Sequence, residues 1–137
     1  MRIAVILIGA LSLLGDLSAQ TIKKVPLAST PANSGKAMFA NYCAACHGAE
    51  GKGDGPAVAA LKTPPPNLTQ LTARENGKFP DNRVANILSG MVSVNAHGST
   101  EMPIWGELLK TVSRNDQNTV QLRISNLTDY VKSLQAK

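Results

Sequence analysis

The chain has 137 residues, with 14 lysines and arginines against 9 aspartates and glutamates, which gives a net charge of +5. This length accommodates one domain, and the 43% hydrophobic and 17% charged residues exclude a disordered, fibrous or low-complexity chain. The aromatic residues are one Trp, two Tyr and two Phe, which is a small supply of large apolar groups. We therefore expect something other than these side chains to help fill the core.

The beginning of the chain has the features of a secretory signal peptide. Arg2 gives a positive start, residues 3–14 form an apolar run, and Ala19 is a small residue at the expected cleavage point. The apolar run is shorter than the roughly twenty residues that a membrane-spanning helix needs. We predict a cleaved signal peptide over residues 1–19 and a soluble domain over residues 20–137 with no membrane insertion. The alternative is a retained N-terminal anchor.

The first predicted element of the domain is a helix over residues 34–43. Asn33 or Ser34 is a suitable N-cap after a proline, and an apolar face begins at residues 37–39. This helix leads directly into the first cysteine of the chain.

The most specific motif follows, and it reads Cys43-Ala44-Ala45-Cys46-His47. Two thiols three positions apart can bond both vinyl groups of one haem, and the adjacent imidazole can reach its iron. The motif therefore predicts one covalent haem c attached at the two cysteines, with the histidine as a ligand of the iron. The alternatives are a disulfide in an exported chain, a thioredoxin-like redox pair and a zinc half-site. The redox pair needs a βαβ unit and the zinc site needs two further ligands, and neither context is present.

A loop is predicted over residues 48–56, where four of nine residues are glycine. This segment lacks both the residue spacing and the preceding strand of a phosphate-binding loop. Residues 57–62 are predicted to form a short helical turn. Three successive prolines over residues 64–66 end that turn because they remove hydrogen-bond donors and keep the chain extended.

The next predicted helix runs over residues 82–89, with Asp81 as its N-cap and Gly90 as its end. Its apolar face contains Val84, Ile87 and Leu88. Residues 91–106 lack helical periodicity, so we predict a loop. A loop of this length in a small domain usually has a function.

This loop offers Met102 as a second axial ligand, because Pro103 holds the backbone after it and a thioether is a soft, neutral donor that favours Fe(II). Met38 lies in the helix that leads to the attachment motif and is badly placed to reach the opposite face of the haem. Met91 lies at a helix end, and His97 is the remaining rival. An iron without a second protein ligand is a further alternative.

The last predicted helix spans residues 119–135. Its apolar residues recur at alternating spacings of three and four, which is typical of an amphipathic helix. The apolar stripe contains Val120, Ile124, Leu127, Val131 and Leu134. The residues predicted on the solvent side are Arg123, Asp129 and Lys132.

Taken together, these features resemble the class I c-type cytochromes, which are small single-haem electron carriers. The resemblance covers most of the chain after the signal peptide. Gly35 and Phe39 precede Cys43 by eight and four residues, as in the N-terminal helix of that family. The resemblance implies that Leu127 and Tyr130 of the C-terminal helix pack against this N-terminal helix, and that the glycine lets the two backbones approach.

Two further segments carry the same resemblance. Residues 66–68 are similar to the Pro-Asn-Leu segment of the family, in which the Pro66 carbonyl would accept the ring N–H of His47 and Leu68 would pack on the haem. The sequence Met102-Pro-Ile-Trp105-Gly resembles the M-P-x-W-G element of bacterial members, which implies that Met102 is the sixth ligand. Trp105 is interpreted as a wall of the haem pocket or, equally, as a plain core anchor.

The sequence therefore predicts an all-α, single-domain fold with three to five helices around one haem c and its iron. The export signal and the haem motif together indicate a bacterial periplasm. We expect an electron carrier and not an enzyme, with redox partner proteins that present acidic docking faces, and no nucleic-acid partner. The alternatives are a haem subunit of a periplasmic dehydrogenase or oxidase complex and an open-site haem enzyme or sensor. The alternative to steering is an evenly solvated surface. The dispersed basic residues that could steer docking include Lys36, Lys52, Lys62, Arg74, Lys78, Arg83 and Lys110.

Overall fold

The computed structural model describes residues 27–92 and 102–136, and within these ranges the chain forms helices and no strand. The predicted all-α fold is confirmed for this part of the chain. The predicted signal peptide over residues 1–19 and the candidate ligand His97 lie outside the described residues.

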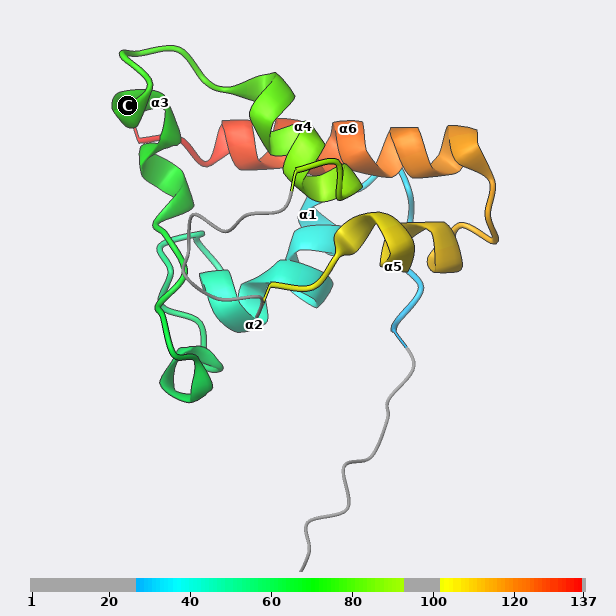
Figure 1. Cartoon of the computed structure of the whole chain (residues 1–137), viewed down its shortest axis with the longest axis horizontal. Coiled ribbons are helices and arrows are strands. Elements are labelled where there is room, and N and C mark those ends of the chain that lie inside the picture. Colours follow the sequence, from blue (N-terminus) through cyan, green and yellow to red (C-terminus); the bar gives the residue numbers. More distant parts are fainter. Residues whose placement is uncertain (1–26, 93–101, 137) are drawn as a thin grey trace, which may run out of the picture.

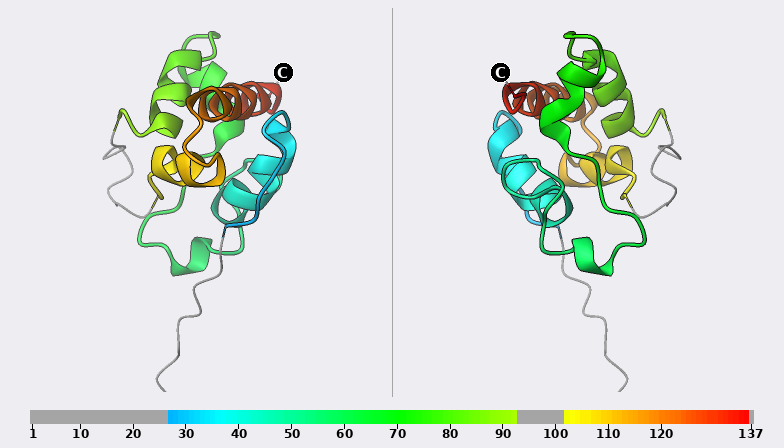
Figure 2. Two further views of the ribbon diagram at one scale, coloured as in Figure 1. Left: turned by 90° about the vertical axis from the view of Figure 1, so that its right-hand side faces the viewer. Right: turned by 90° about the vertical axis from the view of Figure 1, so that its left-hand side faces the viewer.

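One long helix, α6, runs across the molecule, and α1, α4 and α5 pack against it (Figures 1 and 2). The α-helices are α1 (Gly35–Met38), α2 (Ala44–His47), α3 (Leu71–Arg74), α4 (Asp81–Ser89), α5 (Trp105–Val112) and α6 (Gln117–Ser133). A π-helical turn (Phe39–Cys43) joins α1 to α2, and two 3-10 turns (Val58–Ala60 and Leu68–Gln70) lie between α2 and α3. The glycine-rich segment over residues 48–56 has no regular structure, as predicted.

The helix predicted over residues 34–43 is present, but it contains a change of pitch. Ser34 is its N-cap, and the Ser34 hydroxyl accepts a hydrogen bond from the backbone N–H of Ala37 at 3.2 Å. The helical path then continues past Cys43 to His47, through a π turn that the sequence pattern did not predict. A π turn holds one residue more than an α turn, so it changes the direction in which the residues after it project.

A close crossing joins α1 to α6. A Cβ atom at Gly35 would overlap the backbone carbonyl oxygen of Asn126 and would lie 2.8 Å from the Cβ of Tyr130. The rings of Phe39 and Tyr130 are also in contact, with 5.3 Å between their centroids. The predicted packing of Gly35 and Phe39 on the C-terminal helix is confirmed, with Asn126 as the nearest neighbour of the glycine.

The apolar stripe predicted for the C-terminal helix forms the centre of the core, together with buried residues of the other helices. The buried stripe residues are Val120, Ile124, Leu127 and Val131, with Leu134 partly buried at the end of α6. Among the core residues from other elements, Met38, Phe39 and Leu109 are almost completely buried.

The prediction that Arg123 faces solvent is wrong. Its side chain is only 4% exposed. Its Nε donates to the Ser113 hydroxyl at 3.1 Å, and its Nη1 donates to the Thr30 hydroxyl at 3.2 Å. These acceptors come from the end of α5 and from the segment before α1, which cover this face of α6. Asp129 and Lys132 are exposed, as predicted.

The position of Asp81 also differs from its prediction. Asp81 is the first residue of α4, Pro80 occupies the N-cap position, and no side chain caps this end of the helix. The Asp81 carboxylate instead accepts a hydrogen bond from Lys132 Nζ at 2.8 Å, which links α4 to α6. The predicted end of the helix is confirmed, because Gly90 adopts a left-handed conformation with φ of 78°.

The helix α5 was not predicted, since its first residues fall in the stretch interpreted as a loop. It is short, it lacks a side-chain N-cap and it contains a glycine, Gly106, so its local signals are weak. Trp105, Gly106 and Leu109 are buried against the rest of the fold, and this packing accounts for the helix better than its local sequence does.

Replacing Gly35 with alanine is expected to lower the free energy of unfolding by about 1–3 kcal/mol, because the added methyl group would overlap a backbone atom of α6 that cannot rotate away. Chemical denaturation of the purified protein would measure this change. Lys36→Ala is the matched control, since Lys36 is the exposed neighbour on the same helix. An unchanged unfolding midpoint for Gly35→Ala would contradict the close crossing.

Asp81→Asn is expected to lower the unfolding midpoint slightly at neutral pH. The hydrogen bond from Lys132 lowers the pKa of Asp81 below its ordinary value of 3.8. The stabilisation from this pair is therefore fully present above pH 3.8 and is lost as the pH falls through the lower folded-state pKa. Thermal unfolding of both proteins across this range should show the midpoints converging in acid. Asp129→Asn, which removes an exposed carboxylate of α6, should leave the midpoint unchanged at both ends of the range.

Candidate functional site

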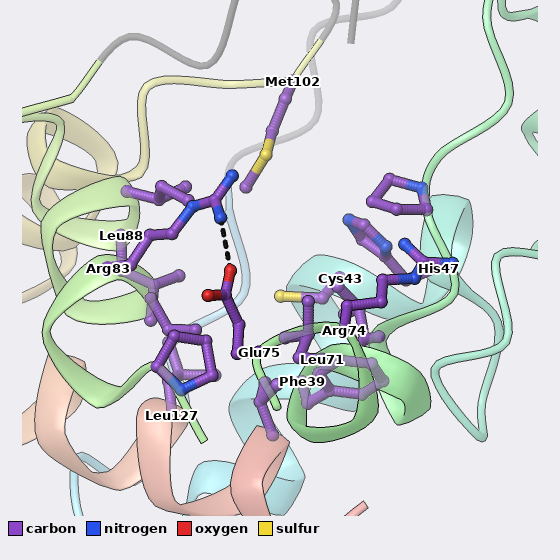
Figure 3. Close-up of a pocket in the computed structure, with 16 residues that line it drawn as sticks. Phe39, Cys43, His47, Leu71, Arg74, Glu75, Arg83, Leu88, Met102 and Leu127 are labelled. Atoms are coloured by element: carbon purple, nitrogen blue, oxygen red, sulfur yellow. Dashed lines mark hydrogen bonds and ion pairs between the residues drawn. The ribbon is translucent and has the colours of Figure 1, made fainter. Parts of the chain in front are cut away.

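Two adjoining cavities lie beside the cysteine motif. The larger contains about 1050 Å³ of space and the smaller about 610 Å³, with their open mouths included. Figure 3 shows the residues that line the larger cavity. The apolar walls of the larger cavity include Phe39, Leu68, Leu71, Leu88, Leu127 and Val131. Four residues line both cavities: Cys43, His47, Pro66 and Met102. These four therefore mark the boundary of the two spaces, and all four were candidate site residues on the sequence alone.

The cysteine motif lies at the junction of the π turn and α2. Cys43 lines both cavities, Cys46 lines the smaller one, and both are half-buried free thiols. In Figure 3 the sulfur of Cys43 is directed into the larger cavity. Burial, with a smaller contribution from the nearby Cys46, raises the pKa of the Cys43 thiol to about 12. Burial therefore disfavours the thiolate, which is the form of a cysteine that acts as a nucleophile.

A zinc centre at this motif would need further ligands. Over residues 27–92 and 102–136, no group of three or more His, Cys, Asp or Glu side chains is arranged to hold a metal ion. Apart from the Glu75 carboxylate, which is paired with Arg83 at the rim, the donors that line the two cavities are an imidazole, a thioether and two thiols. This is a soft set, which suits an iron porphyrin better than a hard cation such as Ca²⁺.

The glycine-rich loop holds the end of the motif in place. The backbone N–H of Gly53 donates to the His47 carbonyl at 2.8 Å, and that of Gly55 donates to the Cys46 carbonyl at 3.1 Å. Gly53 has a φ of 84°, and a Cβ there would lie 2.5 Å from the Pro65 carbonyl oxygen. A residue with a side chain could not bring the loop so close to both the motif and the proline segment.

The proline segment is fixed from two directions. The N–H of Leu68 donates to the Gly51 carbonyl at 2.7 Å. Near the C-terminus, the Gln135 amide donates to the Leu68 carbonyl at 2.8 Å and accepts from the N–H of Thr72 at 2.9 Å. Leu68 therefore lies firmly in the cavity wall. The sequence reasoning missed Gln135, because nothing local to residue 135 signals a contact with residue 68.

Met102 extends into the cavity from the segment that precedes α5, whereas His47 approaches from α2 (Figure 3). The other methionines named as candidates do not enter this space. Met91 is 79% exposed. Met38 is fully buried in the core, where its sulfur accepts a hydrogen bond from Arg123 Nη1 at 3.5 Å.

Trp105 belongs to the core and to the site at once. It is 6% exposed, and it lines the smaller cavity with Pro66 and Met102. Its ring stacks on that of Tyr42, with 5.8 Å between the centroids and 25° between the planes. Tyr42 was not among the predicted site residues. It precedes the motif by one position, and no property of that position identifies it.

Charged residues lie at the rim of the larger cavity, and the sequence reasoning did not place them there. They are Arg74, Glu75 and Arg83, from the end of α3 and from α4. Arg83 Nη1 and Glu75 Oε1 form an ion pair at 2.8 Å (Figure 3). The two arginines were predicted only as dispersed surface cations. Because α3 was not predicted, their position beside the cavity could not be inferred.

Comparison with known proteins gives a match to one family model. The model described as Cytochrome c matches residues 32–135, which include all of α1 to α6. No curated protein and no solved structure matches the chain significantly. Within the described residues, none of the helices combines the length and the hydrophobicity that crossing a membrane requires.

Proposed function

The chain belongs to the cytochrome c family, and on that premise we propose that it is an exported one-electron carrier whose single haem c is ligated by His47 and Met102. Members of this family bind covalent haem c with its iron, and the family generally serves electron transfer. One observation carries the proposal: the imidazole of His47, the thioether of Met102 and the thiol of Cys43 all line the same cavity.

In this proposal the two cysteines hold the haem covalently. Each thiol would hold the haem through one thioether bond, which forms by addition of the S–H group across a vinyl group and needs no oxidant. The apolar walls of the larger cavity, among them Phe39 and Leu127, exclude water from the macrocycle.

His47 and Met102 are the residues that would hold the iron of the haem in this proposal. The Pro66 carbonyl is the proposed acceptor for the second ring N–H of His47, which would fix the orientation of the imidazole. Leu68 in the wall of the larger cavity and Trp105 in the wall of the smaller one would pack on the haem. The bound group supplies a reversible one-electron change at its iron. With two protein donors on the iron, no position would be open to a substrate, and we propose no catalytic activity.

The proposed partners are redox proteins with acidic docking faces. The protein would encounter them in the periplasm, after cleavage of the signal peptide (residues 1–19) has released the domain over residues 20–137. The net charge of +5 supports such steering. Arg74 and Arg83 lie exposed at the mouth of the cavity, where a partner would approach the haem edge. Three of the cations named from the sequence are paired with nearby carboxylates on the surface: Lys52, Arg83 and Lys110.

Covalent attachment has a direct test. Protein matured in a periplasm that can attach haem c should have, after denaturation, the mass of residues 20–137 plus one haem. Cys43→Ala and Cys46→Ala should each remove one thioether bond, and the double variant should lose the haem. An unmodified chain with a disulfide between Cys43 and Cys46 would contradict the proposal.

Met102→Ala is expected to abolish the weak far-red charge-transfer band that a sulfur ligand gives to the oxidised protein. It should also lower the reduction potential and open the iron to added cyanide. Absorption spectra and a redox titration would measure these effects. Met91→Leu is the matched control, because Met91 is exposed and does not line the cavity, and His97→Ala should also retain the band. Rapid cyanide binding by the unaltered protein would instead indicate an open-site enzyme or sensor.

A further inference from the structure

Arg123 is a cation buried without a carboxylate partner in the described part of the chain. The four salt bridges found there join exposed side chains on the surface, and none of them includes Arg123. The guanidinium is 4% exposed and donates only to neutral acceptors, which are the Ser113 hydroxyl, the Thr30 hydroxyl and the Met38 sulfur.

The hydrogen bonds that begin at Arg123 have a fixed direction. Tyr42 donates its one hydroxyl hydrogen to the Ala28 carbonyl at 2.6 Å. The 2.8 Å hydrogen bond between Thr30 and Tyr42 must therefore use Thr30 as the donor. Thr30 in turn accepts from Arg123 Nη1. The Ala28 carbonyl and the hydroxyls of Tyr42 and Thr30 therefore all direct the negative ends of their dipoles toward the guanidinium. This arrangement stabilises the positive charge without neutralising it.

This charge lies behind the wall of the cavities. Met38, which contacts Arg123, is followed by Phe39, and Phe39 lines the larger cavity. Tyr42, which shares Thr30 with Arg123, lines the smaller cavity. On α6 itself, Leu127 follows Arg123 by one helical turn and also lines the larger cavity.

A purely stabilising role explains this arrangement poorly. Removing a charge from water without pairing it with an opposite charge costs folding free energy, and an apolar side chain of similar volume often serves stability at least as well. The position of the charge beside the cavities points to an effect on the group that binds there.

We propose that the buried charge of Arg123 raises the reduction potential of the haem. This inference rests on the proposed function of the cavity. Reduction adds one electron from the donor protein to the ferric iron, so the centre becomes less positive by one charge. A nearby fixed cation therefore favours the reduced form. Because Arg123 is buried, dissolved salt screens this interaction much less than it screens a surface charge.

A redox titration of the haem-loaded protein tests the proposal with two substitutions. Arg123→Met is expected to lower the reduction potential while the low-spin spectrum and the far-red band stay unchanged, and Arg123→Lys should keep most of the potential. Lys36→Met removes one exposed charge of the same sign and should cause a smaller change that vanishes at high salt. Equal potentials for Arg123→Met and Lys36→Met, with intact spectra, would overturn the inference.

If Arg123→Met does not fold, a second pair of variants at Ser113 tests the effect of the Arg123 charge on the reduction potential. The Ser113 hydroxyl lies 3.1 Å from Arg123 Nε, so Ser113→Asp would place a carboxylate against the guanidinium, whereas Ser113→Asn would place a neutral group there. The potential should fall in the aspartate variant and not in the asparagine variant. The same potential in both would overturn the inference.

The structural role of the network can be separated from its charge. Thr30→Val removes one hydrogen bond and leaves the cation, so it should lower the unfolding midpoint and leave the potential near that of the unaltered protein. A potential as low as that of Arg123→Met would overturn the inference in favour of packing. Failure of the proposed function would be distinct, because the unaltered protein would then lack covalent haem or a low-spin spectrum, and the inference would fall with it.

Discussion

The contact of the Gly35 backbone with the Asn126 carbonyl of α6 is the constraint on which the position of the site depends. The helical path that begins at Gly35 continues through the π turn into α2, so the crossing also fixes where Cys43 and His47 lie. One helical turn after Gly35, the ring of Phe39 makes a second contact with α6 through the ring of Tyr130. A Cβ atom at this position would overlap the Asn126 carbonyl oxygen, so glycine is what lets the helix that leads into the motif pack this closely on α6.

The helix α6 ties the other walls of the cavity to the same scaffold. Lys132 near its end holds α4 through Asp81, and Gln135 just beyond it holds the segment that contains Leu68. If the cavity holds haem as proposed, the same ligands must serve in two oxidation states, and walls that move apart would change the ligand geometry and slow each electron transfer. The concentration of these contacts on one helix restrains the cavity walls. The exposed pair of Lys132 and Asp81 orients α4 on α6 more than it adds to the free energy of unfolding.

Sequence patterns predicted the features of this fold that depend on neighbouring residues. The Ser34 cap, the glycine-rich loop and the stop at Gly90 are local effects of side-chain chemistry and backbone freedom. The helix α5 and the contact of Gln135 with Leu68 could not be predicted, since packing between distant segments creates them.

Arg123 is an instructive error among the sequence predictions. It follows Val120 by three residues and precedes Leu127 by four, which places it on the buried face of α6 by periodicity alone. Its charge, however, favoured the solvent side, because an isolated cation is rarely buried. The Ser113 and Thr30 hydroxyls that make burial possible come from segments ten and ninety-three residues away, and no local pattern reveals them.

The charges around the site divide into two groups with different physical reach. Arg83 and Glu75 at the mouth are exposed and paired, so water and salt weaken their fields within a short distance. Their influence is confined to the approach of a partner protein. Arg123 lies in the interior, where the lower dielectric lets a single charge act over the thickness of a side-chain layer. If the cavity holds haem as proposed, surface charge governs how often a partner arrives, and buried charge governs the direction in which the electron then moves.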